Sequence, residues 1–268
     1  MNKSNFSLSI LFILFSGFLF TNCNKENLKL TVPSIPHFLQ SLTDAHACVE
    51  SNYNGNLIFQ SYRTIHSQEI TSARITGQFY GTNGLEDKGD LTIGNNITIS
   101  ADDQNRYETN TNLVDLYGNS NSITLADGSS IYFSENFSLP EMVKITYPSI
   151  YDDFIIEQGA SPITWEVDLN NNIGVAMIIE YLPTFPGNET FVNQGFDKII
   201  LNTKVIVDNG SYNLESSDFE DIPDGALITV RIGRVECNSI VDSETGGKYF
   251  AFGYSIVDAM GKYMGGLD

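Results

Sequence analysis

The fold class is decided by the stretch Leu91-Thr92-Ile93-Gly94-Asn95-Asn96-Ile97-Thr98-Ile99. Its isoleucines and leucine alternate with polar residues on both sides of a Gly-Asn-Asn triplet. Alternation with a period of two is typical of a strand that buries one face, and turn residues between two such runs predict an antiparallel hairpin.

The same pattern recurs along the chain. A second hairpin is predicted around Asp127-Gly128, and a third joins a strand at 201–207 through Asp208-Asn209-Gly210 to a return at 212–214. Residues 175–181 are almost wholly apolar, which indicates a central strand. The polar segment 102–112 is predicted to be a loop.

Helical signals are scarce. Ser217-Asp218-Phe219-Glu220 fits a capping box and predicts a single helical turn. Short strands separated by Gly, Asn, Asp and Pro predict an all-β protein of two tandem antiparallel β-sandwich domains, at 46–148 and 149–268.

The N-terminus has the pattern of an export signal. Lys3 is followed by an apolar run from Phe6 to Phe20, which is shorter than the roughly 20 residues of a membrane span. We therefore expect a signal peptide over 1–22, with Cys23 at its end, and a Pro-containing tether over 23–45.

The charge balance limits the partners. The chain has 14 Lys and Arg against 33 Asp and Glu, a formal charge of −19. Such a charge repels polyanions, so we expect no nucleic-acid partner.

Three cysteines occur, Cys23, Cys48 and Cys237. If Cys23 carries lipid, Cys48 and Cys237 form an even pair in a compartment that permits disulfides. The alternative is that each is a small buried apolar residue.

Catalytic motifs are absent from the sequence. His66 is the only histidine beyond the tether and its junction, and neither a nucleophile elbow nor a zinc-protease motif occurs. We expect no enzyme and no cofactor, although paired carboxylates of the glycosidase type remain open because their separation is spatial.

One segment bears comparison with a calcium loop. Asp168, Asn170 and Asn172 place oxygen side chains at alternate positions, as Ca²⁺ loops do. Ile173 stands where such a loop has glycine, and Ile179 where it has an acid. An Asn-rich hairpin turn is the favoured interpretation.

Aromatic side chains are the other candidates for ligand contact. Tyr80, Tyr107 and Tyr117 lie beside predicted loops, where rings could stack on a sugar. Trp165 alternates with apolar neighbours and is predicted to lie in the core. The stripe Phe250, Phe252 and Tyr254 is predicted to face the interior, or else to belong to an edge strand that pairs with another subunit.

Two resemblances add to these patterns. The N-terminal segment through Cys23 resembles bacterial lipoprotein signals, in which the cysteine is lipidated. Further along, a set of segments resembles the C-terminal module of uncharacterised lipoproteins of the Bacteroidota. The segments are Pro162–Asp168, Gly174-Val175, 178–181, 208–212 and 222–226. The resemblance implies immunoglobulin-like sandwiches and supplies no active site.

The sequence therefore predicts an exported, non-enzymatic lipoprotein of the outer membrane, facing the periplasm or the cell surface. It would be anchored by lipid on Cys23 and would bind a glycan or protein. An adhesive or pilin-like subunit is the alternative, and a carboxylate-based glycosidase comes third.

Overall fold

The computed structural model describes residues 53–64, 72–94, 96–110, 113–148, 155–157, 162–243 and 245–265. The predicted signal and tether, Cys23, Cys48 and the three histidines lie outside these residues.

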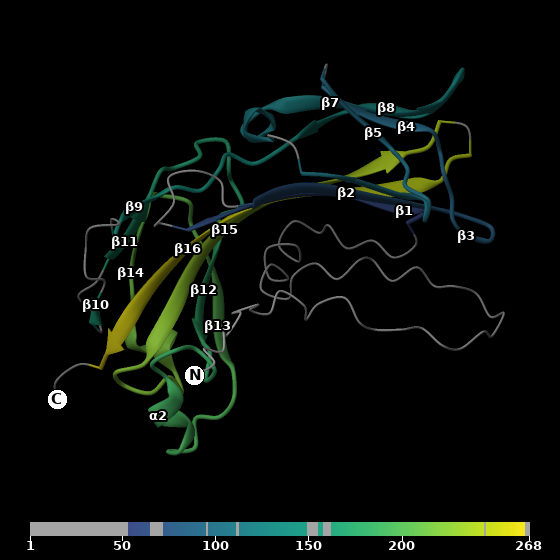
Figure 1. Ribbon diagram of the computed structural model, residues 1–268. Helices are drawn as coiled ribbons and strands as arrows, with labels where there is room; N and C mark the ends of the chain where they lie inside the picture. The colour runs from purple at the N-terminus through teal and green to yellow at the C-terminus, as the bar shows by residue number, and fades with distance from the viewer. Residues whose placement is uncertain are drawn as a thin grey trace, which may run out of the picture.

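A nine-stranded sheet, the large sheet, forms the base of the molecule (Figure 1). Its main path runs in the order β13-β12-β15-β16-β1-β2-β3, with β10 added beside β16 and β6 beside β2. Neighbours are antiparallel except that β1 and β10 run parallel to β16. The strands are β1 (Gly55–Thr64), β2 (Ser72–Gly81), β3 (Gly84–Leu85), β6 (Arg106–Thr109), β10 (Ile155–Glu157), β12 (Val175–Tyr181), β13 (Ile200–Ile206), β15 (Leu227–Val241) and β16 (Lys248–Met264).

Two smaller antiparallel sheets complete the described fold. The four-stranded sheet has the order β5-β4-β7-β8, and the three-stranded sheet has the order β14-β11-β9. Their strands are β4 (Asp90–Ile93), β5 (Ile97–Ser100), β7 (Ser120–Asp127), β8 (Ser130–Ser138), β9 (Ile145–Tyr147), β11 (Pro162–Trp165) and β14 (Ser211–Asn213). In the described part of the chain, the helical segments are single turns, η2 (Val114–Leu116), α2 (Glu189–Val192) and η3 (Ser216–Phe219).

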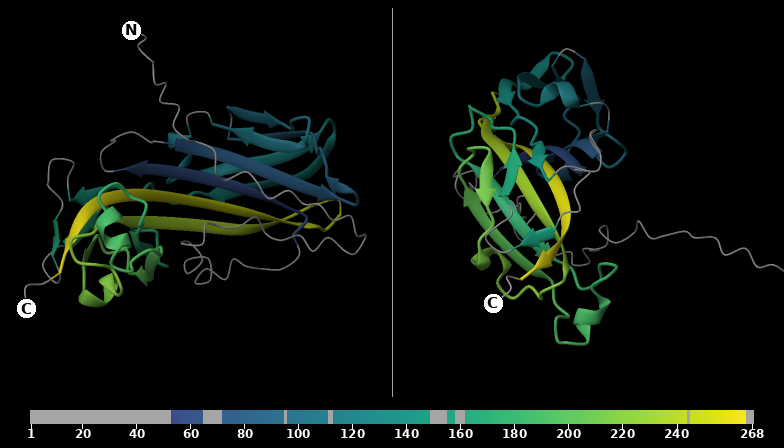
Figure 2. Two further views of the ribbon diagram at one scale, coloured as in Figure 1. Left: turned by 60° about the horizontal axis from the view of Figure 1, so that its bottom comes forward. Right: turned by 90° about the vertical axis from the view of Figure 1, so that its left-hand side faces the viewer.

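Both smaller sheets pack on the same face of the large sheet. In β16, Tyr249 and Ala251 belong to the core under the four-stranded sheet, here called the first core. Val257 and Ala259, an even number of residues further on, belong to the core under the three-stranded sheet, the second core. In a strand, side chains at every second position lie on the same face. These four residues therefore share one face of β16, and the strand passes beneath both cores. Figure 2 shows β15 and β16 as two long strands that span the molecule.

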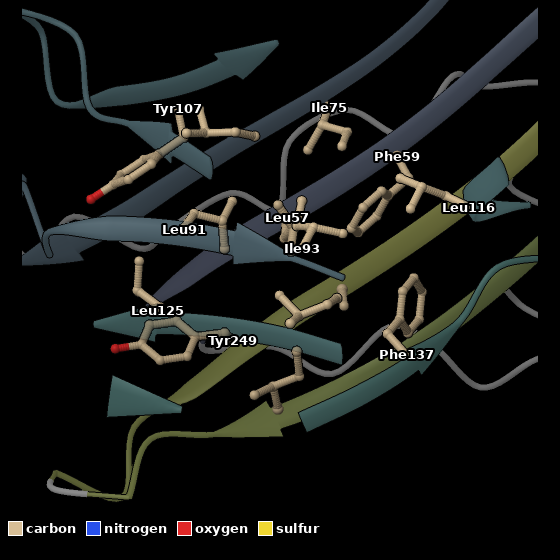
Figure 3. Close-up of a cluster of buried hydrophobic side chains, with 14 of the residues drawn as sticks. Leu57, Phe59, Ile75, Leu91, Ile93, Tyr107, Leu116, Leu125, Phe137 and Tyr249 are labelled. Carbon is tan, nitrogen blue, oxygen red and sulfur yellow. The ribbon is translucent and has the colours of Figure 1, made fainter. Parts of the chain in front are cut away.

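The first core joins β1 and β2 to the four-stranded sheet (Figure 3). Leu57 and Phe59 of β1 face Leu91 and Ile93 of β4, with Tyr249 of β16 beside them. The apolar residues whose alternation at 91–99 predicted a hairpin thus lie in this core.

The predicted all-β class, built of antiparallel sandwiches, is confirmed. The division at residues 148 and 149 stays a prediction. The large sheet itself is continuous across it, because β1 pairs with β16 from Gly55–Tyr249 to Thr64–Asp258.

The hairpins predicted at 91–99 and around Asp127-Gly128 are confirmed as β4–β5 and β7–β8. Trp165 is buried as predicted, and so is the stripe from Phe250 to Tyr254. The predicted helical turn is η3, although its capping box uses Glu215 and Asp218 in place of Ser217 and Glu220.

Three local predictions were wrong. Strand β14 does not return beside β13 but pairs with β11 in the other sheet. The segment 168–174 likewise leads from one sheet to another and is not a hairpin turn. The polar segment 102–112 contains β6, which pairs with β2 and buries Tyr107.

The final strand is also not an edge. β16 lies between β15 and β1, so its backbone groups are engaged on both sides. Edge-to-edge pairing of this strand with another subunit is therefore blocked in the folded chain.

Candidate functional site

A polar pocket of about 210 Å³ opens between the two smaller sheets, above the middle of β15. We call it the junction pocket. It is lined by the start of β7, the end of β8 with the link that follows it, the loop after β11 and the centre of β15. The lining residues are Gly118, Asn119, Ser120, Ser138, Leu139, Pro140, Glu141, Asp168, Asn170, Asn171, Val235 and Glu236.

The order of apolar and polar residues in β15 leaves a gap between the two cores, and the junction pocket lies above this gap. Ile228, Val230 and Ile232 fill the second core, and Ile240, on the same face, reaches the first core. Between them the alternate positions are Arg234, Glu236 and Asn238. Because these polar side chains replace apolar ones on the inner face, the two cores are separated at this point.

Strand β16 has small residues opposite this part of β15. Gly253 and Ser255 occupy its inner face where the link from β8 crosses the large sheet. A Cβ atom at Gly253 would lie 2.2 Å from Cδ2 of Leu139, so only glycine permits this approach. The buried Ser255 Oγ accepts a hydrogen bond from the Val143 amide at 3.1 Å. Small residues in β16 thus fix the position of one pocket wall.

The opposite wall is the loop after β11. Oδ1 of Asp168 accepts a hydrogen bond from the Asn170 amide at 2.9 Å, and its Oδ2 accepts a longer one from the Glu141 amide at 3.4 Å. The side-chain amide of Asn171 donates to the Gly174 carbonyl at 2.7 Å and to Oδ2 of Asp208 at 2.9 Å. The loop is therefore tied both to the link and to the layer beneath it.

A buried ion pair lies behind this wall. Nε and Nη2 of Arg234 donate to the two carboxylate oxygens of Asp208 at 2.7 and 3.0 Å. Trp165 Nε1 donates to the same carboxylate at 2.8 Å, and Arg234 also donates to the Glu166 carbonyl. Burial alone would raise the pKa of Asp208, but the hydrogen bonds from Arg234, Trp165 and Asn171 bring it below its usual range.

The pocket is acidic. Glu141, Asp168 and Glu236 line it, and none of its lining residues is Lys or Arg. Burial raises the pKa of Glu236, and the negative charge of Asp168 raises it further. Such a site repels anions and favours neutral ligands with hydroxyl or amide hydrogens, or cations.

The structure brings part of the predicted calcium set to this pocket. Asp168 and Asn170 line it, whereas Asn172 is exposed and does not. Within the described ranges, no group of three or more His, Cys, Asp and Glu residues is arranged to hold a metal ion.

The predicted ligand tyrosines lie elsewhere. Tyr107 has an exposed fraction of 0%, and its hydroxyl accepts a hydrogen bond from the Lys88 amide at 2.8 Å. Tyr117 is buried beside the pocket, and its hydroxyl donates to the Tyr254 carbonyl at 3.1 Å. Both rings are core residues and present no face to a ligand. Tyr80 is half-buried on β2, away from the pocket lining.

Sequence reasoning missed Glu236, Asn119 and Glu141. One signal in the sequence points to Glu236. Arg234, Glu236 and Asn238 interrupt an otherwise apolar alternation in a strand of the large sheet, which marks a place where the strand leaves one core and has not reached the next. Asn119 and Glu141 join the site only through the packing of the β8 link.

Cys237, on β15, is disulfide-bonded. Its predicted partner Cys48 lies outside the described residues, so that pairing stays a prediction. Within the part of the chain that the structure describes, no helix has the length and apolar character needed to cross a bilayer.

Comparison with known proteins gives little further guidance. No family model and no curated protein matches the chain. Among solved structures, the FN1–FN3 domains of chicken CNTN1 are similar at a TM-score of 0.21 and 10% identity, over 80% of this chain and 66% of that one. A similarity this weak supports no inference, so the fold class rests on the strand pairing described above.

Proposed function

We propose that this protein is a non-enzymatic lipoprotein of the bacterial outer membrane that binds a glycan in the junction pocket. The signal pattern of residues 1–22, followed by Cys23, supports export and lipid anchoring. The single observation that carries the binding proposal is the polar pocket between the two sandwiches, since ligand sites are preferentially found where two packing units meet.

The chemistry of the lining suits a neutral sugar. The carboxylates of Asp168 and Glu236 and the amides of Asn119 and Asn170 offer acceptors for sugar hydroxyl groups, and the amides also donate. The volume of about 210 Å³ accommodates one or two sugar rings at most. We expect an uncharged or cationic saccharide rather than a sulfated or uronic one.

The test is a glycan array, followed by titration calorimetry, with residues 24–268 and with a Glu236→Gln variant. Gln keeps the size of the side chain but loses the negative charge, so we expect binding to weaken about tenfold, the loss of roughly one charge-assisted hydrogen bond. Glu135→Gln is the matched control, because Glu135 is exposed on β8 and does not line the pocket. Equal binding by wild type and Glu236→Gln would refute the assignment of this site.

The anchoring proposal has a separate test. A Cys23→Ala variant should lose its attachment to membranes and appear in the soluble fraction after separation without detergent. A variant that remains with the membrane would contradict lipid anchoring through Cys23.

A carboxylate-based glycosidase is the second candidate. The observation that favours it is the presence of Glu236 and Asp168 in one pocket, because glycosidases place two carboxylic acids about the bond that they cleave. A protein that releases reducing sugar from a bound glycan, with Glu236→Gln binding but not hydrolysing it, would select this function. Binding without turnover would select the first.

A further inference from the structure

Strand β13 has a free edge on the side away from β12 (Figure 1). Among the described residues, its seven residues pair with β12 alone, and the register between the two strands contains no bulge. The strand also lacks proline. Sheet edges are commonly protected by bulges, by proline or by very short strands, such as the two-residue β3 at the other end of the main path. The edge of β13 has none of these protections.

The face of β13 turned away from the second core is apolar and exposed. Ile200 and Ile206 pack against that core, so the residues that alternate with them lie on the opposite face. These residues, with one more at each end of the strand, are here called the outward row. Its members are Ile199, Leu201, Thr203, Val205 and Val207. The four apolar members have exposed fractions between 38% and 74%.

The single charged residue of β13 does not belong to the outward row. Lys204 lies on the inner face and forms an ion pair with the buried carboxylate of Asp218. Its Nζ also lies 4.7 Å from the ring centroid of Tyr212. Lysine on an edge strand normally discourages pairing with another chain. Because this lysine is engaged within its own copy, it leaves the edge open to pairing.

The outward row is symmetric about Thr203, with two apolar residues on each side. In an antiparallel pair of two β13 strands with Thr203 opposite Thr203, Leu201 of one copy lies opposite Val205 of the other. In the same register Ile199 lies opposite Val207. Each apolar side chain therefore meets an apolar side chain, and such cross-strand pairs stabilise a sheet.

The inner face of β13 is compatible with the same register. Lys204 of one copy falls opposite Asn202 of the other, so the two lysines do not face each other. Ile200 falls opposite Ile206, which again pairs apolar residues. A pairing of this kind has two-fold symmetry and uses both edges at once, so it closes at two copies and does not continue into a filament.

We propose that two copies of this chain join edge to edge through β13, in an antiparallel pair centred on Thr203. The large sheets of the two copies then form one continuous sheet. The occupant of the edge is a second copy because the outward row complements itself in this register. The proposal depends neither on the junction pocket nor on the lipid anchor.

The dimer is expected to be weak. One strand from each copy buries less than the roughly 1,600 Å² of a standard interface. Each copy also carries a formal charge of −19, so the two copies repel each other at long range. We expect a dissociation constant on the order of 10–100 μM, measured by sedimentation at about 0.15 M salt, where the repulsion is screened beyond about 8 Å.

The register is tested by oxidative cross-linking of cysteine variants of the full chain in which Cys23 is replaced by Ala. Residues directly opposite each other have Cα atoms about 5 Å apart, within reach of a disulfide. Thr203→Cys should therefore form at least about ten times more covalent dimer than Leu201→Cys, whose two copies lie about 14 Å apart in this register. A mixture of Leu201→Cys and Val205→Cys proteins should cross-link again, because these positions face each other. The chain without a new cysteine gives the background.

Three results would overturn the proposal. The first is a protein that stays monomeric at about 500 μM. The second is equal cross-linking by Leu201→Cys and Thr203→Cys, and the third is a mixture of Leu201→Cys and Val205→Cys that gives no more dimer than either protein alone. The mixture tests the register with Thr203 intact, so it decides the question even if Thr203→Cys does not fold.

Discussion

Asp208 and Arg234 form an ion pair that ties the turn before β14 to the centre of β15. The side chains of both are almost completely buried. Replacing one member of such a pair leaves the other charge buried without compensation. We expect Asp208→Asn to lower the free energy of unfolding by about 3–5 kcal/mol at pH 7, measured by urea denaturation. Asp197→Asn, at an exposed position, is the control and should change it by less than about 0.5 kcal/mol.

The pH dependence of this pair has a definite sign. The pKa of Asp208 is lower in the folded protein than its usual value, so its contribution is present above the unfolded pKa of about 3.9. It is lost as the pH falls through the folded pKa. The difference between wild type and Asp208→Asn should therefore shrink as the pH is lowered below about 4, and a constant difference would contradict the ion pair as its source.

Gly253 allows the link from β8 to cross β16. Gly253→Ala should lower the free energy of unfolding by about 1–3 kcal/mol, because the added methyl group overlaps Cδ2 of Leu139. Combining it with Leu139→Ala removes the clash, so the double variant should lose less stability than the two single variants added together. Simple additivity in thermal or urea denaturation would show that the two residues do not meet.

At the residue scale, sequence reasoning located core residues better than site residues. Trp165 could be assigned to the interior from its alternating neighbours, since burial follows local pattern. The sequence could not predict that Glu236 and Glu141 line the same pocket, because only the path of the link after β8 over the large sheet brings Glu141 near Glu236.

At the level of the elements, β13 is the last strand at one end of the large sheet's main path. Two of its outward side chains, Leu201 and Val205, are exposed apolar residues. An exposed apolar edge invites pairing with a second copy, and lysine on an edge suppresses it. Leu201→Lys with Val205→Lys should change stability by no more than about 0.5 kcal/mol per site, and should reduce whatever self-association the wild-type protein shows in sedimentation experiments.

The matched control is Ile206→Lys on the same strand. Ile206 packs against the second core, so this variant should destabilise the fold instead. If the two outward lysines leave association unchanged, β13 is not the surface through which copies of the chain meet, and the adhesive alternative loses its structural support.

Element prediction succeeded where the chain folds back on itself at once. The β4–β5 and β7–β8 hairpins close over a few residues, and turn residues with alternation define them. Strand β14 was misassigned because its turn contains Asp208, whose carboxylate is held by Trp165 and Arg234 from distant elements. Such a tertiary contact directs the chain into the other sheet and leaves no mark in the local sequence.

At the scale of the whole molecule, β15 and β16 couple the two sandwiches. Both strands contribute to the first and the second core, so neither core can lose them alone. Leu125→Ala in the first core should lower the urea midpoint measured by fluorescence of Trp165 in the second core by as much as the midpoint measured by circular dichroism. The expected loss is about 2–5 kcal/mol.

The outcome that contradicts this coupling is equally clear. If Leu125→Ala leaves the Trp165 transition unchanged, or separates two transitions, the sandwiches unfold independently. The sequence predicted two units from the recurrence of strand patterns, but it did not predict that they share strands, because pairing between β1 and β16 joins residues far apart in the chain, such as Gly55 and Tyr249.

The partnership of β1 and β16 also sets an order of events during synthesis. Gly55 of β1 pairs with Phe79 of the nearby β2, but its other partner is Tyr249 of β16, so the first core stays incomplete until β16 has been made. A first core that stays incomplete until β16 is made is compatible with passage of the unfolded chain through a narrow secretion channel. If the protein is exported, as we propose, we expect this topology to delay closure of the first core until the chain has crossed the membrane.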